Sequence, residues 1–307
     1  MKNITFLLLF ILPVFLFSQK QESFISLINQ LDRELVQYSK VSPFGEEYIA
    51  IKEFDFSKKE KKQLIKEADY DAVLSKNKDS IQQFHMIFYY QDRILDQLDE
   101  LLKHPDFKKN DIAKMISGDE LSIVKSADNK LYNFSLDGKN GGTYRQRISI
   151  MHFTDLVFQD SSDVDHYSIF EGDGYNEIIM LDTDDGVKYV LTGSVRGCSY
   201  CFETFVQLVS FENNAFNLDF EYSVVNRDWN DGAYYDHETK TVNVKYHVDD
   251  LTQFCGCDED KQTYFEYDKY DRNQTPILCE CKFVFNVNNF ELVKDSWEKV
   301  EASDEDE

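Results

Sequence analysis

The spacing of apolar residues changes twice along the chain. An unbroken apolar run occupies residues 6–17, and residues 19–118 then carry apolar side chains mostly at helical spacing. The remainder alternates with the period of two that is typical of strands. This pattern predicts an α+β protein in which a helical N-terminal segment, residues 19–118, precedes an antiparallel β-meander domain, residues 119–298.

The helical segment should contain three long helices. The first begins near Phe24, and the second begins at Ser57, whose spacing from Glu60 is that of a capping box. The third should begin near Asp79 and end before Pro105, and a short helix from about Asp111 should end at Gly118. We expect the third helix to bury Ile81, Phe84, Phe88, Leu95, Leu98 and Leu102.

Short turn sequences separate the strand-like runs after Gly118. They include Asp-Asp-Gly at 184–186, Glu-Asn-Asn-Ala at 212–215, His-Glu-Thr-Lys at 237–240 and Val-Asn-Asn at 287–289. Turns of this kind join consecutive strands as hairpins, so the strands should be antiparallel neighbours. A blade-like, a barrel-like and a sandwich arrangement all fit this pattern.

The N-terminus has the order of a secretory signal peptide. Lys2 precedes the apolar run, and small Ser18 stands before polar Gln19. The run has roughly twelve residues, whereas crossing a bilayer takes about twenty. We therefore expect residues 1–18 to be removed as a signal peptide, which places the mature protein in the periplasm or outside the cell with no integral membrane segment.

The charge of the chain narrows the choice of partners. The formal net charge is −24, and such a surface repels phosphate backbones, which argues against nucleic acid as a partner. A hydrophobic content of 42% is that of a globular protein. The acidic residues 299–307 are expected to form a disordered tail.

One stretch of the chain resembles a known group. The run DGVKYVLTGS, the later FVQLVSFENNAFNL and YYDHETKTVNVKY, and a closing aromatic hairpin fall within residues 175–297. Together with a signal ending in Ser-Gln, these runs resemble uncharacterised exported proteins of Bacteroidota-type bacteria. The resemblance implies export, and it brings no activity and no catalytic residue.

Six cysteines form three close pairs in the strand-rich region: Cys198 with Cys201, Cys255 with Cys257, and Cys279 with Cys281. An even number in an exported chain predicts disulfides. If the two Cys-x-Cys strands lie side by side and antiparallel, Cys255 bonds to Cys281 and Cys257 to Cys279, while Cys198 and Cys201 close a small loop. Two alternatives are a redox dithiol at Cys198 and Cys201 and a zinc site made by the other four cysteines.

Two groups of oxygen-bearing side chains are candidate metal sites. Glu171, Asp173, Asn176 and Glu177 form a calcium-loop-like stretch, although Asp-Gly pairs here and at 185–186 also signal turns. A carboxylate–histidine group follows later, and solvated loop positions are the simpler interpretation of its spacing. That second group contains Asp228, Asp231, His237, Glu238, His247, Asp249 and Asp250.

No catalytic fingerprint accompanies these residues, and nearby aromatic side chains indicate binding instead. Trp229, Tyr234 and Tyr235 are placed to line a sugar or peptide groove. The sequence therefore favours a non-enzymatic binding or interaction protein, with an unknown protein or a glycan as its ligand. A secreted hydrolase acting on carbohydrate or peptide through carboxylates of residues 228–250, and a calcium-stabilised structural module, stay as alternatives.

Overall fold

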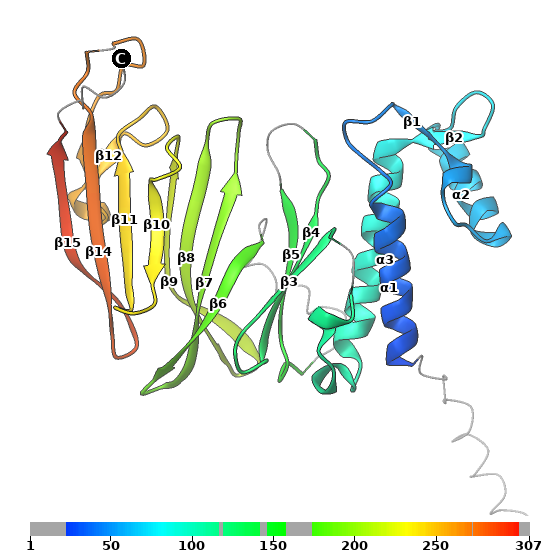
Figure 1. The fold of residues 1–307 in the computed structure, drawn as a ribbon, viewed down its shortest axis with the longest axis horizontal. Helices are drawn as coiled ribbons and strands as arrows, with labels where there is room; N and C mark the ends of the chain where they lie inside the picture. Colours follow the sequence, from blue (N-terminus) through cyan, green and yellow to red (C-terminus); the bar gives the residue numbers. More distant parts are fainter. Residues whose placement is uncertain (1–22, 117–118, 142–145, 158–173, 272, 301–307) are drawn as a thin grey trace, which may run out of the picture.

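The computed structural model describes residues 23–116, 119–141, 146–157, 174–271 and 273–300. The predicted signal peptide, the expected helix end at Gly118 and residues 301–307 of the predicted acidic tail lie outside these ranges. Lys299, which was expected to belong to that tail, is instead the last residue of a β-strand. Within them, the expected order of a helical part followed by antiparallel β-strands is confirmed (Figure 1).

The helices and the first sheet come first along the chain. The helices are α1 (Phe24–Tyr38), α2 (Lys58–Tyr70) and α3 (Gln83–Lys103). The short strands β1 (Tyr48–Ala50) and β2 (Ser80–Gln82) pair with each other as a two-stranded antiparallel ribbon. The first sheet contains β3 (Leu121–Lys125), β4 (Leu131–Asp137) and β5 (Arg147–Phe153), and we call it the helix-side sheet.

Two four-stranded sheets follow. The central sheet contains β6 (Tyr175–Thr183), β7 (Gly186–Arg196), β8 (Phe202–Glu212) and β9 (Ala215–Asn226) in that order. The C-terminal sheet has the order β10 (Gly232–Asp236), β11 (Thr241–His247), β14 (Ile277–Asn286) and β15 (Asn289–Lys299). A separate ribbon pairs β12 (Phe254–Cys255) with β13 (Thr263–Tyr264).

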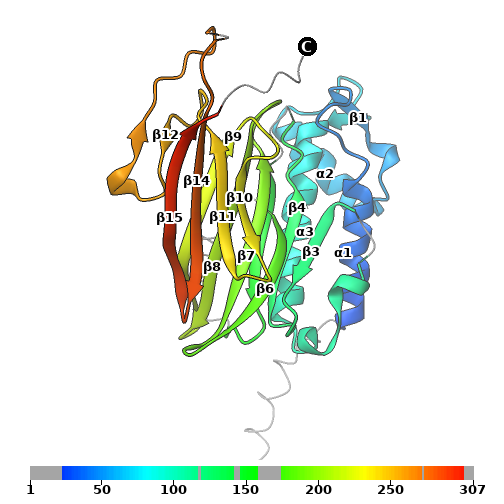
Figure 2. The same ribbon diagram turned by 60° about the vertical axis from the view of Figure 1, so that its left-hand side comes forward.

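The helices, the helix-side sheet, the central sheet and the C-terminal sheet are stacked in the order in which they occur in the sequence (Figures 1 and 2). One core joins α1 and α3 to Tyr132, Phe134 and Leu136 of β4, so a single core includes residues on both sides of position 118. A second joins β4 and β5 to the central sheet, and a third joins the central sheet to the C-terminal sheet. Because β8 is covered on both faces, its middle residues form a continuous buried run instead of an alternating one.

The helices agree with the sequence in part. The capping box between Ser57 and Glu60 is confirmed. The third helix begins at Gln83 and not near Asp79, because residues 80–82 pair with β1. The predicted buried face of α3 is wrong at Phe84 and Phe88, which are 50% and 60% exposed. The face that packs inward contains Met86, Ile87, Tyr90, Ile94, Leu98 and Leu101.

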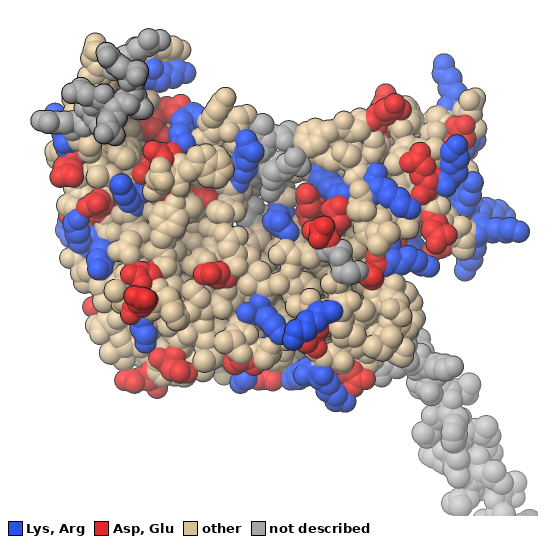
Figure 3. All heavy atoms as spheres, viewed as in Figure 1, with Lys and Arg blue, Asp and Glu red and all other residues tan. Residues whose placement is uncertain are grey.

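The short helix expected from about Asp111 is a single 3₁₀ turn at Ile112–Lys114 in the described residues. None of the described helices has both the length and the apolar content needed to cross a membrane. Positive and negative side chains are interspersed on the face seen in Figure 3, so this face is not uniformly acidic despite the negative net charge of the chain.

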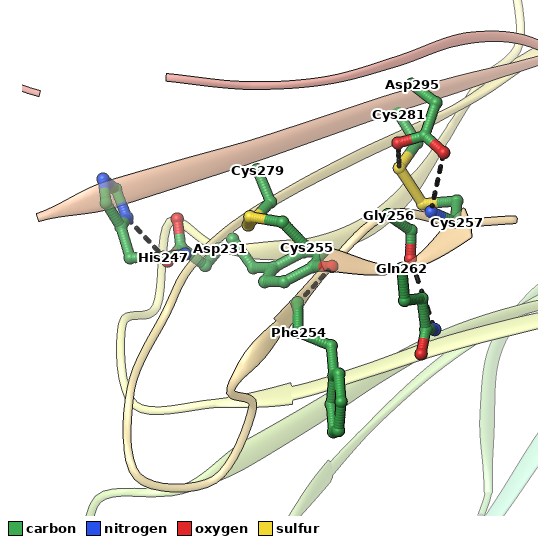
Figure 4. The surroundings of a disulfide bond; sticks show 11 residues. Asp231, His247, Phe254, Cys255, Gly256, Cys257, Gln262, Cys279, Cys281 and Asp295 are labelled. Carbon is green, nitrogen blue, oxygen red and sulfur yellow. Dashed lines mark hydrogen bonds and ion pairs between the residues drawn. A yellow bond between two sulfur atoms is a disulfide. The ribbon is translucent and has the colours of Figure 1, made fainter. Parts of the chain in front are cut away.

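All six cysteines are disulfide-bonded, and the pair Cys198–Cys201 is as expected. The predicted pairing of the other four is wrong: Cys255 bonds to Cys279 and Cys257 to Cys281. The antiparallel pairing fails because β11 and β15 already occupy both edges of β14. Phe254 and Cys255 pair with β13 instead, and the segment from Cys255 to Cys257 runs in the same direction as Cys279–Cys281 (Figure 4).

Candidate functional site

A groove of about 550 Å³ lies where the central sheet meets the C-terminal sheet. We call it the aromatic groove. Strands β6, β7 and β8 supply one side, and the loop 227–231 with β10 supplies the other. Its volume falls in the range of pockets that hold small ligands. It is lined by Arg147, Asn176, Glu177, Thr192, Gly193, Ser194, Val195, Arg196, Phe202, Thr204, Trp229, Asp231, Ala233, Tyr234 and Tyr235.

An exposed tryptophan forms the most prominent part of this groove. The indole ring of Trp229 lies on the ring of Phe202, with centroids 3.3 Å apart, and Trp229 is nevertheless 71% exposed. The Tyr234 hydroxyl donates hydrogen bonds to the carbonyl oxygens of Asp231 and Trp229, at 2.9 and 3.3 Å. These contacts hold the exposed indole in a fixed position at the edge of the groove, where it adds an aromatic face to the groove wall.

The close approach of the two sheets depends on Gly232 and Thr204. The main-chain N–H of Ala233 donates to the Thr204 hydroxyl at 2.8 Å, which links β10 to β8. Gly232 has a φ of +153°, and a Cβ atom there would clash with Thr204 Oγ1 and Tyr234. A glycine is therefore required beside the aromatic wall.

Charged and amide side chains form the opposite wall. Arg196 donates from its guanidinium to the carbonyl oxygens of Cys198 and Ser199, at 3.2 and 3.1 Å, so the small disulfide loop is attached to the rim. Asn176 Nδ2 donates to the Ser194 hydroxyl at 3.3 Å, and Glu177 is exposed beside it. The groove thus offers donors and acceptors facing an aromatic surface.

One lining residue of the aromatic groove, Asp231, is a buried aspartate paired with a histidine. The Asp231 side chain is 1% exposed, and its Oδ2 accepts from Asn226 Nδ2 at 2.7 Å. The same oxygen accepts from the main-chain N–H and the ring Nδ1 of His247, at 2.8 and 2.9 Å (Figure 4). Asp231 Oδ1 has no hydrogen-bond partner among the described residues.

The pair is an ionised carboxylate beside an imidazole. Burial alone would raise the pKa of Asp231, but the hydrogen bonds from His247 and Asn226 outweigh it and lower that pKa below its usual value. The hydrogen bond to Asp231 raises the pKa of His247. With Nδ1 bonded to the carboxylate, Nε2 is the ring nitrogen left for other contacts.

A second groove has a volume of about 570 Å³. We call it the acidic groove because Asp228, Asp231, Asp249 and Asp271 line it together with His247. Asp231 borders both grooves. The ligand atoms of Asp228, Asp231 and His247 all lie within 4.8 Å of one another.

The structure separates the members of the predicted carboxylate–histidine group. Asp228, Asp231 and His247 come together, and Asp249 lines the same groove. Asp250 instead forms an ion pair with Arg227, with distances of 2.7 and 2.9 Å. His237 and Glu238 lie in the turn between β10 and β11, at the other end of that hairpin.

The calcium-loop stretch is only partly described. Glu171 and Asp173 lie outside the described residues, while Asn176 and Glu177 are exposed on β6 and line the aromatic groove. Asp184 and Asp185 form the turn of the β6–β7 hairpin, in which Thr183 pairs with Gly186, so turn formation accounts for them.

The disulfides exclude one of the two alternative functions considered for the cysteines, the zinc site. A four-cysteine zinc site is excluded because Cys255, Cys257, Cys279 and Cys281 are all bonded to one another in pairs. The Cys198–Cys201 loop leads directly into β8 and not into a helix, whose N-terminus would activate a redox thiol. Three disulfides indicate a protein that matures in an oxidising environment.

The sequence pointed to Trp229, Tyr234 and Tyr235 but missed Phe202, Thr204 and the two arginines of the groove. It also held a signal for the Asp231–His247 pair. The His-Glu-Thr-Lys turn sets Asp236 opposite Thr241. Counting back along that hairpin places Asp231 opposite Tyr246, one residue before His247.

Comparison with models of protein families, with curated proteins and with solved structures finds no match to this chain. Its function therefore has to be inferred from the geometry of its own side chains.

Proposed function

We propose that this is an exported, non-enzymatic binding protein of the periplasm or cell exterior, and that its aromatic groove holds a segment of a glycan chain. The single observation that carries the proposal is the exposed indole of Trp229, fixed on Phe202 at the edge of a groove with charged walls. The signal-like N-terminus and the three disulfides support export.

A glycan fits both walls of the groove. One face of a pyranose ring presents C–H groups that pack on an aromatic surface, while hydroxyls at its edge need polar partners. Trp229 and Tyr234 offer the surface, and Glu177, Asn176 and Arg196 offer acceptors and donors opposite. Because the groove lies at the surface, a chain can pass through it without being enclosed.

Binding is favoured over hydrolysis by the state of Asp231. Glycoside hydrolysis needs one carboxyl group that stays protonated as a general acid, which requires a raised pKa. The pKa of Asp231 is lowered, and its Oδ2 already accepts three hydrogen bonds, one from Asn226 and two from His247. Such a carboxylate holds structure in place and is a poor proton donor.

The test uses soluble hexasaccharides and two tryptophan variants. Cellohexaose, mannohexaose and chitohexaose are titrated into the mature chain by calorimetry, and Trp229→Ala is compared with Trp297→Ala. Trp297 is the matched control because it is also exposed, at 45%, but lies on β15 away from the groove.

We expect at least one hexaose to bind, and Trp229→Ala to weaken that binding 10-fold or more while Trp297→Ala changes it less than 2-fold. Equal loss in both variants, or no binding of any of the three sugars, would contradict the proposal. Shorter sugars appearing in the mixture would show a hydrolase instead.

A further inference from the structure

We propose that Asp228, Asp231 and His247 form a binding site for one divalent transition-metal ion, of which zinc is the representative, at the wall of the acidic groove. This proposal does not rest on glycan binding, because its ligands line the acidic groove, which shares only Asp231 with the aromatic groove. The three side chains come from the loop between β9 and β10 and from the last residue of β11.

The proposal begins with the unsatisfied oxygen of Asp231. Asp231 is 5% exposed, and its side chain is 1% exposed. Asn226 and His247 supply three donors to Oδ2, and no described residue supplies one to Oδ1. A buried carboxylate oxygen without a partner is costly, and a cation at that oxygen removes the cost.

The other two ligands lie within reach of the same ion. The ligand atoms of all three residues are within 4.8 Å of one another. Zinc binds oxygen and nitrogen at about 2.0–2.2 Å, so two ligand atoms of a tetrahedral ion are about 3.4 Å apart. Closing the site therefore takes a movement of up to about 1.4 Å. Asp228 can supply this movement because it is exposed and its carboxylate rotates.

Asn226 holds the acidic residues in place for this purpose. Its Nδ2 donates to Asp231 Oδ2, and its Oδ1 accepts from the main-chain N–H of Asp228, both at 2.7 Å. The Asp231 N–H also donates to the carbonyl oxygen of Asp228, at 3.1 Å. The loop is therefore a tight turn that brings both carboxylates to one side of His247.

The ligand types select the class of metal. Calcium and magnesium are bound by oxygen, whereas an imidazole with two carboxylates suits zinc, manganese and similar ions. Three protein ligands leave a fourth position of a tetrahedral ion open to water or to a donor of a bound molecule. The three ligands all line the acidic groove, so a molecule bound in that groove could supply the fourth donor.

The test is calorimetric titration of ZnCl₂, and separately CaCl₂, into the tag-free mature chain after dialysis against a chelator. A thiol assay first confirms that all six cysteines are oxidised, because free thiols would bind zinc. We expect one zinc ion per chain and at least 10-fold weaker binding of calcium.

Two variants locate the site. Asp228→Asn keeps the oxygen that accepts from the Asn230 N–H at 2.9 Å, so the turn is retained and only the charge is lost. Asp249→Asn removes the same charge from the same groove and keeps the oxygen that accepts from the N–H groups of Leu251 and Thr252. We expect Asp228→Asn and His247→Gln to weaken zinc binding 10-fold or more and Asp249→Asn to change it less than 2-fold.

A second readout uses the tryptophan next to Asp228. The chain has two tryptophans, so Trp297→Phe leaves Trp229 as the sole reporter. Binding of Co²⁺ should quench its fluorescence, and excess Zn²⁺ should reverse the quenching. The proposal is overturned if zinc does not bind, if calcium binds as tightly as zinc, or if Asp228→Asn binds zinc as tightly as the wild-type chain while showing the same thermal unfolding.

Discussion

Asp231 and His247 are joined twice, because a single carboxylate oxygen of Asp231 accepts both the main-chain N–H and the ring Nδ1 of His247, at 2.8 and 2.9 Å. This contact connects the loop before β10 to the end of β11. His247 pairs in turn with Leu278, the residue before Cys279, so the Asp231 loop is fixed to a strand that carries two disulfides. The walls of both grooves depend on this connection.

We expect Asn226→Ala to loosen the loop that carries Trp229. The buried Asn226 side chain makes two hydrogen bonds, to Asp231 and from the N–H of Asp228. Losing both leaves buried polar groups unpaired, and the free energy of unfolding in urea should fall by about 1–3 kcal/mol. Asn230→Ala is the control, since its side chain contacts only the exposed Asp228 in the described contacts. Similar losses in the two variants would contradict this role.

Acid should destabilise the fold in part through His152 on β5. Its ring packs edge-on against Phe107, with centroids 4.8 Å apart, and burial lowers the pKa of His152 from 6.5 to about 3. Between these values the unfolded chain binds a proton that the folded chain does not, so stability is lost as the pH falls below 6.5. The loss is at most about 1.4 kcal/mol per pH unit.

His152→Gln removes this titration and keeps a polar side chain. Urea unfolding at pH 6.5 and pH 5.0 should show a loss of stability smaller in the variant than in the wild-type chain by about 1–2 kcal/mol. The comparison cancels the contribution of the many carboxylates, which both chains share. An equal loss in the two chains would mean that His152 does not resist protonation in the folded state.

The disulfide pairs are directly measurable. A non-reduced peptide map should give Cys255 linked to Cys279 and Cys257 linked to Cys281. Each of these bonds joins residues 24 apart in sequence, and closing such a loop contributes about 3 kcal/mol. The double variant Cys257→Ala with Cys281→Ala should therefore unfold at lower urea, by an amount up to that value. A peptide map that shows Cys255 linked to Cys281 would contradict this pairing and support the antiparallel arrangement of the two Cys-x-Cys segments.

Local patterns in the sequence predicted the local structure well. The turn residues placed the hairpins, because Asn213 and Asn214 both adopt positive φ, at 53° and 64°, which asparagine tolerates better than most residues. The capping box at Ser57 was found because both of its hydrogen bonds join residues three apart.

Predictions failed where one pattern allowed two tertiary arrangements. Helix α3 has apolar residues on more than one face, and its periodicity alone cannot decide that Met86 and Tyr90 pack inward while Phe88 faces solvent. The cysteine pairing failed for a similar reason. The two-residue spacing correctly put Cys279 and Cys281 on one buried face, but the direction of the partner segment depends on which strands already border β14.

Hydrogen–deuterium exchange with and without the tightest-binding hexaose tests the central claim most directly, because it maps where the sugar lies. We predict that bound sugar slows exchange in residues 202–204 and 228–234, which contain Phe202, Trp229 and Tyr234, and leaves β14 and β15 unchanged. Slower exchange confined to other strands, with none around Trp229, would contradict the assignment of the aromatic groove as the binding site.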